Sequence, residues 1–259
     1  MSEKFIILSS CFNKNKYLRE FFQSIIKQTY RPIEIVIAND CSDDGSYETL
    51  LQLEKESKNY DIEFKLINNN KKLYCGSSYS NLVKYATYGS FYGVVDSDDM
   101  LVPDAVRYVV DLYRQYPQVS WIYTQFQTCD RHMQPIQKGI SRHPPEGMSI
   151  LDLGEKRKHS YSHWRTFSNK INNPTELFCQ NLKCAVDKYM GYKLEELGTG
   201  LFVDRVCYLY RQGVKRSVAA SEKTKDTWLK ITQEAVQRRI KNNIKAFPIL
   251  EYKEENGKN

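Results

Sequence analysis

Three carboxylates crowd a short stretch near the middle of the chain. Asp96, Asp98 and Asp99 directly follow the apolar run 91–95 and precede Pro103. Carboxylates at the end of a buried strand repel one another unless a cation or the donors of a ligand neutralise them. Such oxygen donors suit Mg²⁺ or Mn²⁺, ions that keep some water ligands and are shared with phosphate oxygens. The competing interpretation is an acidic turn that caps the helix beginning at Pro103.

A further carboxylate, Asp204, lies in the segment 201–211, which we predict to be a helix. On that helix its neighbours would be Leu201, Cys207 and Tyr208, all of low polarity. A lone carboxylate in such surroundings is expected either to be paired or to face a cleft. The alternative is a structural salt bridge, or a carboxylate stabilised by the helix dipole.

The elements that must position these residues alternate in type through the first half of the chain. Hydrophobic periodicity predicts strands at 4–10, 33–38, 62–67, 91–95 and 119–123, separated by helices at 17–29, 46–57, 77–87 and 103–116. This alternation predicts an open, mostly parallel, Rossmann-like α/β sheet flanked by helices. Ligands of such sheets bind at the carboxyl ends of the strands. The loops that follow strands should therefore meet at that edge: 10–14, 39–45, 68–76 and 96–99.

The pattern weakens after residue 124, which divides the predicted domain into parts 1–124, 125–222 and 223–259. We expect a loop at 142–147, a helix within 175–189, and a basic, largely exposed helix at 223–244 followed by a solvated tail. A polar and aromatic segment, 156–173, contains His163, Trp164 and Arg165. These side chains suit sugar and phosphate contacts, and the competing interpretation is a packed Trp with two surface polar residues.

Composition narrows the class of protein. The 259 residues carry a net charge of +7 without a dense Lys/Arg run, so anionic small partners such as nucleotides are favoured over nucleic acid. The seven cysteines are scattered and odd in number, which favours a reduced, cytoplasmic protein. No segment is apolar for long enough to span a bilayer, so at most peripheral contact with a membrane surface is expected.

Four motifs together resemble those of glycosyltransferase family 2. Residues 6–13 are similar to the opening strand of the family, which ends in a small residue, an aromatic residue and Asn. Residues 24–37 lead into 39–46, similar to the family's Asp-Asp-Gly-Ser-x-Asp-Gly loop, although Asn39 and Cys41 replace its first Asp and Gly. Residues 89–103 match the metal-binding motif with its flanks. Residues 191–192 and 203–205 lie where the family has Gly-Gly-Phe and Glu-Asp elements, with Val203 replacing the Glu.

The resemblance implies a GT-A fold and an inverting transfer of sugar from a nucleotide-diphosphate sugar, with UDP favoured. It implies a donor-binding half at 1–124, where Asp40 would bind the uracil N–H and the loop with Ser10, Phe12 and Asn13 would line base and ribose. Asp96 or Asp98 would contact the ribose, and Asp98 or Asp99 would hold Mn²⁺ or Mg²⁺.

In residues 125–222, the acceptor-side extension, the resemblance makes Asp204 the general base. His163, Trp164 and Arg165 lie where the family binds acceptors. The acceptor would be a hydroxyl of a glycan, a glycolipid or another lipid-linked glycan, or a glycoprotein.

Three other readings compete with glycosyl transfer. An Asp-x-Asp phosphotransferase or phosphatase usually carries its motif after the first strand, whereas here the motif follows the fourth. A sugar-nucleotide pyrophosphorylase would carry a Gly-rich N-terminal loop, which this sequence lacks. A sugar-nucleotide-binding protein without transfer activity remains open, because Val203 departs from the family's acidic pair.

Overall fold

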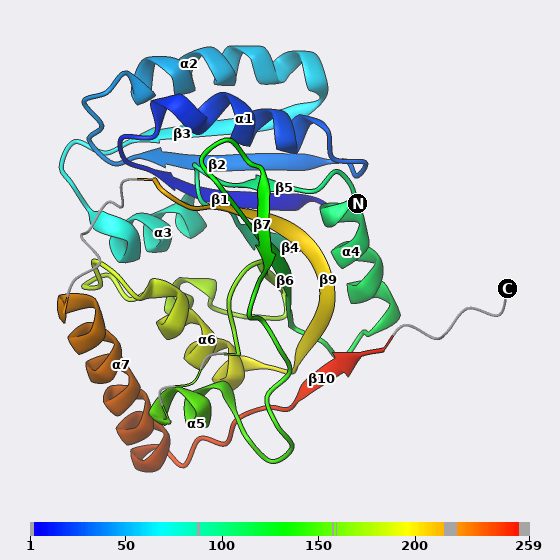
Figure 1. Ribbon diagram of the computed structural model, residues 1–259, viewed down its shortest axis with the longest axis vertical. Coiled ribbons are helices and arrows are strands. Elements are labelled where there is room, and N and C mark those ends of the chain that lie inside the picture. The colour runs from blue at the N-terminus through cyan, green and yellow to red at the C-terminus, as the bar shows by residue number, and fades with distance from the viewer. Residues whose placement is uncertain (1–2, 87–88, 157, 159, 215–221, 254–259) are drawn as a thin grey trace, which may run out of the picture.

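The computed structural model describes residues 3–86, 89–156, 158, 160–214 and 222–253, and its strands form a single sheet (Figure 1). The strand order is β10-β9-β6-β8-β4-β1-β2-β3, with β5 paired to β9 and β7 paired to β6. Strand β1 pairs in parallel with β2 and β4, and β2 pairs in parallel with β3. Strand β8 runs antiparallel to both β4 and β6. The α/β sheet flanked by helices is therefore confirmed, and its second half is mixed.

The first half follows the predicted alternation closely. Its strands are β1 (Phe5–Cys11), β2 (Ile33–Asn39), β3 (Ile62–Asn68) and β4 (Phe91–Val94), and its helices are α1 (Asn15–Ile26), α2 (Ser46–Ser57), α3 (Tyr74–Tyr85) and α4 (Ala105–Gln115). Short additional elements are η1 (Lys58–Tyr60) and β5 (Met100–Leu101). Helix α3 begins earlier than predicted, because the backbone N–H groups of Leu73 and Tyr74 donate to the Asp40 carboxylate at distances of 2.7 and 2.9 Å.

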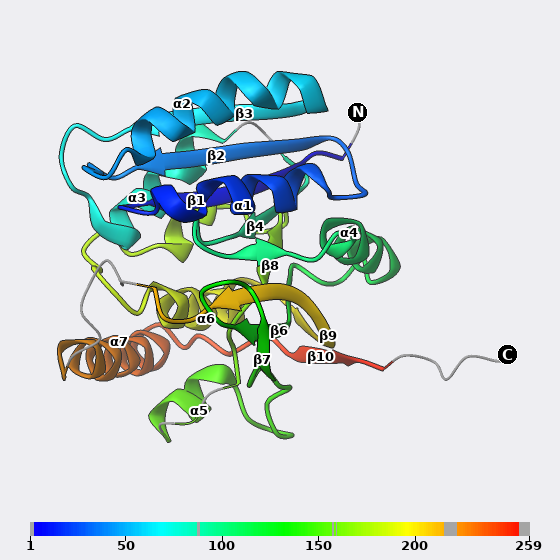
Figure 2. The same ribbon diagram turned by 45° about the horizontal axis from the view of Figure 1, so that its top comes forward.

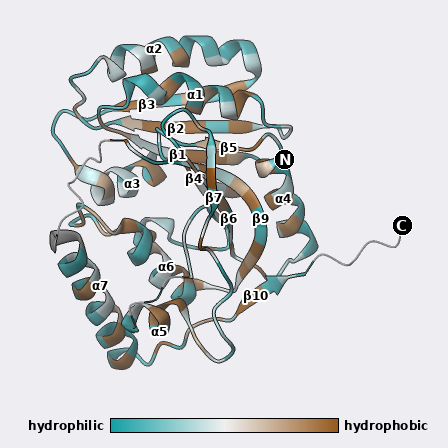
Figure 3. Cartoon of the chain, in the orientation of Figure 1, coloured by the Kyte–Doolittle hydropathy of each residue, from teal (hydrophilic) through white to brown (hydrophobic). Residues whose placement is uncertain are grey.

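Successive side chains of β1 enter two different cores, one on each face of the sheet. Phe5 and Ile7 pack with residues of α1, α2 and α4, whereas Ile6 and Leu8 pack with residues of α3 and of the C-terminal helices. Figure 2 shows these helices on opposite sides of the strands, and Figure 3 shows that the central strands are mainly hydrophobic. A strand buried on both faces explains why the opening segment reads as a continuous apolar run.

The strands that the structure describes in the second half of the chain extend the same sheet. They are β6 (Trp121–Cys129), β7 (Pro135–Lys138), β8 (Arg165–Ser168), β9 (Gly200–Arg211) and β10 (Ile249–Tyr252). The helices of this half are α5 (Ile150–Glu155), η2 (Pro174–Leu177), α6 (Val186–Leu197) and α7 (Glu222–Lys241). The predicted boundary at residue 124 falls inside β6, so the two predicted halves share one strand.

The helix predicted at 201–211 is wrong, because this segment is the long strand β9. It pairs in parallel with β6 and β10 and in antiparallel fashion with β5. Its side chains alternate between the two cores: Leu201 and Val203 enter one, and Phe202 enters the other. The helix predicted within 175–189 also differs, since only the turn η2 and the first residues of α6 are helical there. The basic helix predicted near 223–244 is confirmed as α7.

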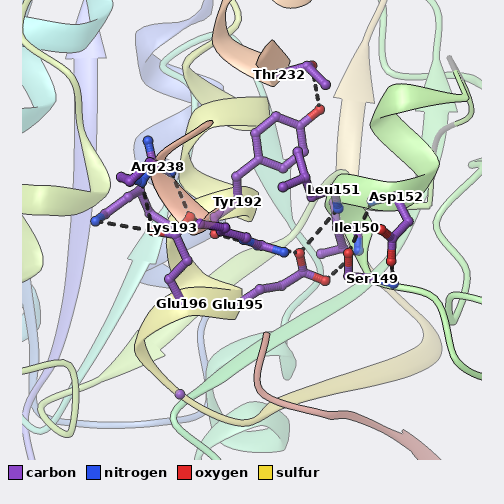
Figure 4. Close-up of polar contacts among 12 residues, drawn as sticks. Ser149, Ile150, Leu151, Asp152, Tyr192, Lys193, Glu195, Glu196, Thr232 and Arg238 are labelled. Atoms are coloured by element: carbon purple, nitrogen blue, oxygen red, sulfur yellow. Dashed lines mark hydrogen bonds and ion pairs between the residues drawn. The ribbon is translucent and has the colours of Figure 1, made fainter. Parts of the chain in front are cut away.

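Helices α5, α6 and α7 are joined by the Glu195 cluster, which consists of Glu195, Glu196, Arg238, Arg239, Lys193, Tyr192 and Thr232 (Figure 4). Glu195 on α6 accepts hydrogen bonds from the first two backbone N–H groups of α5 and from Arg239 on α7. These contacts hold α6 in place, and Asp187 lies in the first turn of that helix. Among the described helices, none has the length and apolarity needed to cross a bilayer.

Candidate active site

A cavity of about 590 Å³ opens at the carboxyl ends of β1, β2 and β4. All four loops predicted to meet at this edge contribute to it, and the segment before α6 and the end of β9 close it. Its polar and charged lining residues are Ser10, Lys14, Asp40, Lys72, Tyr74, Tyr79, Asp96, Ser97, Asp98, Asp99, Lys183, Tyr210, Arg211 and Gln212. The edge rule for open α/β sheets therefore located the cavity correctly.

The three clustered carboxylates occupy different environments in this cavity. Asp98 is paired with Lys14, whose Nζ lies 2.5 Å from its Oδ2. Asp96 accepts a hydrogen bond from the Tyr79 hydroxyl at 3.0 Å. Asp99 is buried, and its two oxygens accept hydrogen bonds from the Tyr208 hydroxyl and the Arg211 backbone N–H, each at 2.7 Å. Asp96 and Asp98 are therefore partly exposed, whereas the buried Asp99 braces the loop.

Electrostatics in this cluster favour an added cation. Burial raises the pKa of Asp98, an effect that Lys14 opposes and Asp96 reinforces. Burial and then the charges of Asp98 and Asp96 raise the pKa of Asp99 well above its usual range. A raised carboxyl pKa means that the negative charges are incompletely compensated by the protein. The acidic loop thus presents closely spaced carboxylate oxygens of the kind that suit a divalent cation.

The donor set fits an ion that is only partly held by protein. Among the described residues, no three His, Cys, Asp or Glu side chains form a group that could hold a metal ion by themselves. Mg²⁺ and ions like it are commonly held by one or two carboxylates together with substrate phosphates. Asp98, with Asp99 beside it, matches that pattern, and Lys14 places a positive charge against the same carboxylate.

Asp40 lies at the cavity with most of its hydrogen-bonding capacity in use. Its Oδ1 accepts from Asn69 Nδ2 at 3.0 Å and from the Leu73 N–H, and its Oδ2 accepts from the Tyr74 N–H. A carboxylate offers about four acceptor positions. One position on Oδ2 therefore remains for a ligand N–H, while the other three order the loop 69–74.

The loop after β1 reaches the cavity through two of its three predicted residues. The Ser10 hydroxyl lies 2.9 Å from the Ser78 hydroxyl, and the Phe12 ring lies beneath Lys72, whose Nζ is 3.2 Å from the ring centroid. Asn13 is absent from the cavity lining. It adopts a φ of 54° and binds Asp43 through its Nδ2 at 2.7 Å, which joins the first and second loops.

Asp204 is not brought to this cavity. It lies on β9 with 58% of its side chain exposed, and its Oδ2 is 2.9 Å from Lys138 Nζ. Its Oδ1 accepts a hydrogen bond from Gln125 at 3.2 Å. The reasoning that gave Asp204 an apolar helical environment is wrong, because alternate residues of a strand point to opposite faces. The structure instead matches the surface salt bridge that the sequence left open.

Asp187 is the carboxylate that sequence reasoning missed. It follows the cavity residues Lys183, Cys184 and Ala185 and lies in the first turn of α6. Burial alone would raise the pKa of Asp187, but the positive charges of Lys188 and Arg165 and a backbone hydrogen bond from Lys188 lower it. Asp187 is thus a carboxylate kept ionised beside the cavity. The only sequence signal was an acidic residue at the start of a helix, which is common in proteins.

The three residues expected to contact an acceptor differ in accessibility. Trp164 is completely buried against Phe5, with ring centroids 5.6 Å apart, so the expected sugar-stacking role of Trp164 does not fit. The His163 ring is stacked between Tyr208 and Tyr210, at centroid distances of 4.7 and 5.1 Å. Arg165 is also buried, not a surface residue, and donates to His163 Nδ1 at 3.1 Å. Burial lowers the pKa of His163 well below its usual value, and Arg165 lowers it further.

Arg211 is a second residue whose importance the sequence concealed. It ends β9, and its side chain is buried. Its Nε donates to the Asp98 carbonyl at 2.7 Å, and its terminal nitrogens bind the Arg131 carbonyl and Glu20. Together with its N–H bond to Asp99, this arrangement holds the acidic loop against β9.

Comparisons with known proteins agree with this geometry. The model of glycosyl transferase family 2 matches residues 6–175. A chondroitin synthase of Escherichia coli is 27% identical over 94% of this chain and 34% of its own length. A hyaluronan synthase of Pasteurella multocida is 25% identical over 76% of this chain and 19% of its own length. The chain therefore spans about a third or less of these curated relatives.

Solved structures show the same fold at low sequence identity. S. aureus TarS in complex with UDP-GlcNAc has a TM-score of 0.70 and 17% identity, covering 90% of this chain and 66% of that one. GalNAc-T7 with UDP, GalNAc and Mn²⁺ has a TM-score of 0.65 and 14% identity, covering 94% and 56%. These neighbours confirm the predicted GT-A fold. Since the family model covers well over half of its residues, the chain belongs to glycosyl transferase family 2.

Proposed function

We propose that this domain is an inverting, metal-dependent glycosyltransferase that moves a sugar from a UDP-sugar to a hydroxyl of a glycan, glycolipid or glycoprotein. The observation that carries the proposal is the convergence of Asp40, Asp96 and Asp98 in one cavity at the carboxyl ends of β1, β2 and β4. Family membership supports it, as do neighbours solved with UDP, UDP-GlcNAc and GDP-Man.

In this proposal the donor lies along the carboxyl edge of the sheet. The remaining acceptor position of Asp40 Oδ2 suits a pyrimidine N–H, and Phe12 offers an aromatic surface near the base. Asp96 contacts the ribose. Asp98, supported by Asp99, would hold Mn²⁺ or Mg²⁺, which when bound offsets the negative charge of a diphosphate. Lys14 lies close enough to that carboxylate to assist in the same neutralisation.

We propose Asp187 as the general base in place of Asp204. The acceptor hydroxyl oxygen forms a bond to the anomeric carbon while Asp187 takes its proton. On the opposite side of that carbon, the bond to the diphosphate oxygen breaks, and its electron pair leaves with UDP. One direct displacement inverts the anomeric configuration. The support is the position of Asp187 beside the cavity and its lowered pKa, which keeps it ionised and ready to accept a proton.

The test is nucleotide release from a panel of UDP- and GDP-sugars, with Mn²⁺ and simple hydroxyl acceptors. We expect at least one UDP-sugar to release UDP, EDTA to abolish release, added Mn²⁺ to restore it, and Asp98→Asn to lose it. NMR of the glycoside product should show an inverted anomeric centre. UDP binding by calorimetry without release across the panel would favour a sugar-nucleotide-binding protein. Phosphate release from a phosphomonoester would favour the phosphate-processing alternative.

A further inference from the structure

The acidic loop 96–99 is joined to strand β9, although β4, the strand that leads into this loop, is not a neighbour of β9. Strands β8 and β6 lie between β4 and β9 in the sheet. The contact is made through β5, which begins directly after Asp99 and pairs in antiparallel fashion with β9, so that Leu101 lies opposite Tyr208. Tyr208 therefore lies beside the acidic loop, and it is fully buried.

The Tyr208 hydroxyl contacts both ends of this loop. It accepts a hydrogen bond from the Asp96 N–H at 3.1 Å and donates one to Asp99 Oδ2 at 2.7 Å. The Asp99 N–H also donates to the Asp96 carbonyl at 3.0 Å, which closes the loop as a turn. A phenolic hydroxyl can donate one proton and accept at the same oxygen. One atom of β9 thus joins the first and last residues of the turn that carries Asp98.

An irregularity in β9 directs Tyr208 towards this turn. While β6 advances from Thr124 to Phe126, its partner β9 advances from Val203 to Tyr208, and the strand is strongly curved (Figure 1). Because side chains of a regular strand alternate, Tyr208 would otherwise face the same core as Phe202. It packs instead in the core that contains Val203, on the other face of the sheet. Bulges often re-aim a side chain next to an active site, and this one brings the hydroxyl to the acidic loop.

The Tyr208 ring is held by its neighbours. The His163 ring stacks on it at a centroid distance of 4.7 Å and an interplanar angle of 9°. His163 is itself held, because Tyr210 stacks on it at 5.1 Å and Arg165 donates to its Nδ1 at 3.1 Å. A ring packed in this way keeps its hydroxyl in a fixed place. His163 therefore supports Tyr208, a role that requires no contact with an acceptor.

We propose that Tyr208 is a positioning residue for the divalent cation, which places Asp98 by fixing both ends of the turn around it. This inference rests on the proposed function, in which Asp98 holds Mn²⁺ or Mg²⁺. Tyr208 supplies no ligand to the ion and acts through its hydrogen bonds with Asp96 and Asp99. Loss of such an outer partner commonly lowers metal affinity or activity by about 10–100-fold. Arg211 binds the same turn, so loss of the Tyr208 hydroxyl should loosen the turn without releasing it.

The experiment uses Tyr208→Phe, which removes one oxygen atom and keeps the ring that stacks on His163. Tyr192→Phe is the matched control, because Tyr192 is also buried and its hydroxyl makes two hydrogen bonds, with Thr232 and Trp228. Mn²⁺ is titrated into each protein with UDP present, and the EPR signal of free Mn²⁺ gives the affinity. We expect Tyr208→Phe to bind Mn²⁺ about tenfold more weakly, the lower end of the range for such partners. Tyr192→Phe should bind it as the wild type does.

Two further measurements separate positioning of the ion from a general loss of structure. UDP affinity in EDTA should be nearly unchanged in Tyr208→Phe, because the hydroxyl acts on the metal-binding turn. Sugar transfer by Tyr208→Phe should be low at limiting Mn²⁺ and should return close to the wild-type rate at saturating Mn²⁺. A loss of transfer that saturating Mn²⁺ does not relieve would contradict the inference.

Amide hydrogen exchange in the resting protein tests the same contact without metal or turnover. The Asp96 N–H should exchange faster in Tyr208→Phe, because its acceptor is removed, whereas the Val95 N–H, bonded to the Leu8 carbonyl, should not change. Faster exchange together with weaker Mn²⁺ binding would support the inference. Unchanged exchange, or faster exchange with unchanged Mn²⁺ affinity, would overturn it and leave Tyr208 a packing residue. A wild type that binds UDP but no Mn²⁺ would contradict the proposed metal dependence, and this inference with it.

Discussion

The cavity and the Glu195 cluster both bury carboxylates, but they compensate the charges differently. In the cluster each glutamate faces arginine: Glu195 binds Arg239 at 3.1 Å, and Glu196 binds Arg238 at 2.7 Å. At the cavity three aspartates crowd one loop, where the charge of Asp96 adds to burial in raising the pKa of Asp98 and, together with Asp98, that of Asp99.

The difference lies in the neighbouring charges. A buried charge that the protein itself neutralises holds elements together. Carboxylates that lie close to other carboxylates can accept the positive charge of a ligand. We therefore interpret the Glu195 cluster as structural and the cavity as functional. Removing charges from the cluster should lower stability, and removing them from the cavity should lower activity.

The largest expected effect concerns the base at the cavity. Asp187→Asn should lower transfer by about 10²–10⁴-fold, because a general base contributes an effect of that size. Asp204→Asn should leave transfer within about threefold, since Asp204 is exposed and paired with Lys138. Initial rates under donor saturation measure both, with circular dichroism as the control for folding. The reverse outcome would return the base to Asp204 and make Asp187 part of the structure.

The next effect concerns stability and the Glu195 cluster. Arg239→Met should lower the free energy of unfolding by about 3–5 kcal/mol, because it leaves a fully buried carboxylate without its charged partner. Urea unfolding measures the loss, and Arg239→Met with Glu195→Gln should recover part of it. UDP affinity should be nearly unchanged if the variant stays folded at the assay temperature. A stable Arg239→Met variant would contradict the structural role assigned to the cluster.

A smaller effect is expected from pH. Burial raises the pKa of Glu195 from 4.5 to about 7, although the Ile150 N–H and Arg239 oppose it. Between pH 4.5 and about 7, Glu195 therefore keeps its proton in the folded protein, whereas the unfolded chain releases it. The contribution of Glu195 to stability consequently falls as the pH rises through this range. The change amounts to at most roughly 3 kcal/mol. Wild type and Glu195→Gln, unfolded in urea at pH 5 and pH 8, should differ in this dependence; parallel curves would exclude it.

The smallest effect is expected at the surface. Lys138→Met removes the partner of Asp204, and both side chains are more than half exposed. Exposed ion pairs contribute about 0–1 kcal/mol, and salt weakens them further. Thermal unfolding in low and high salt should therefore show little difference from the wild type. A loss above about 2 kcal/mol would mean that Asp204 belongs with the buried charges after all.

The first half of the site could be predicted from residues close together in sequence. Each predicted loop directly follows its own strand, and short connections force parallel strands to present their carboxyl ends at one edge. Asp40, Asp96 and Asp98 therefore had to meet, whatever the details of packing. Asn13 shows the limit of that rule, since edge placement alone did not determine which loop residues face the cavity and which brace a neighbouring loop.

The second half of the sheet and the environment of Asp187 depend on residues that are distant in sequence. The segment 200–211 is a strand because β6, β5 and β10 pair with it, and no pattern of its own specified those partners. The pKa of Asp187 is lowered by the adjacent Lys188 and then by Arg165 on β8, whose charge acts on it only in the folded chain. Sequence alone determined the family, the first half of the sheet and the edge at which the cavity lies, because these depend on local periodicity and motif. Tertiary structure decided which acidic residue is kept ionised at the cavity, because burial and charge are properties of packed neighbours.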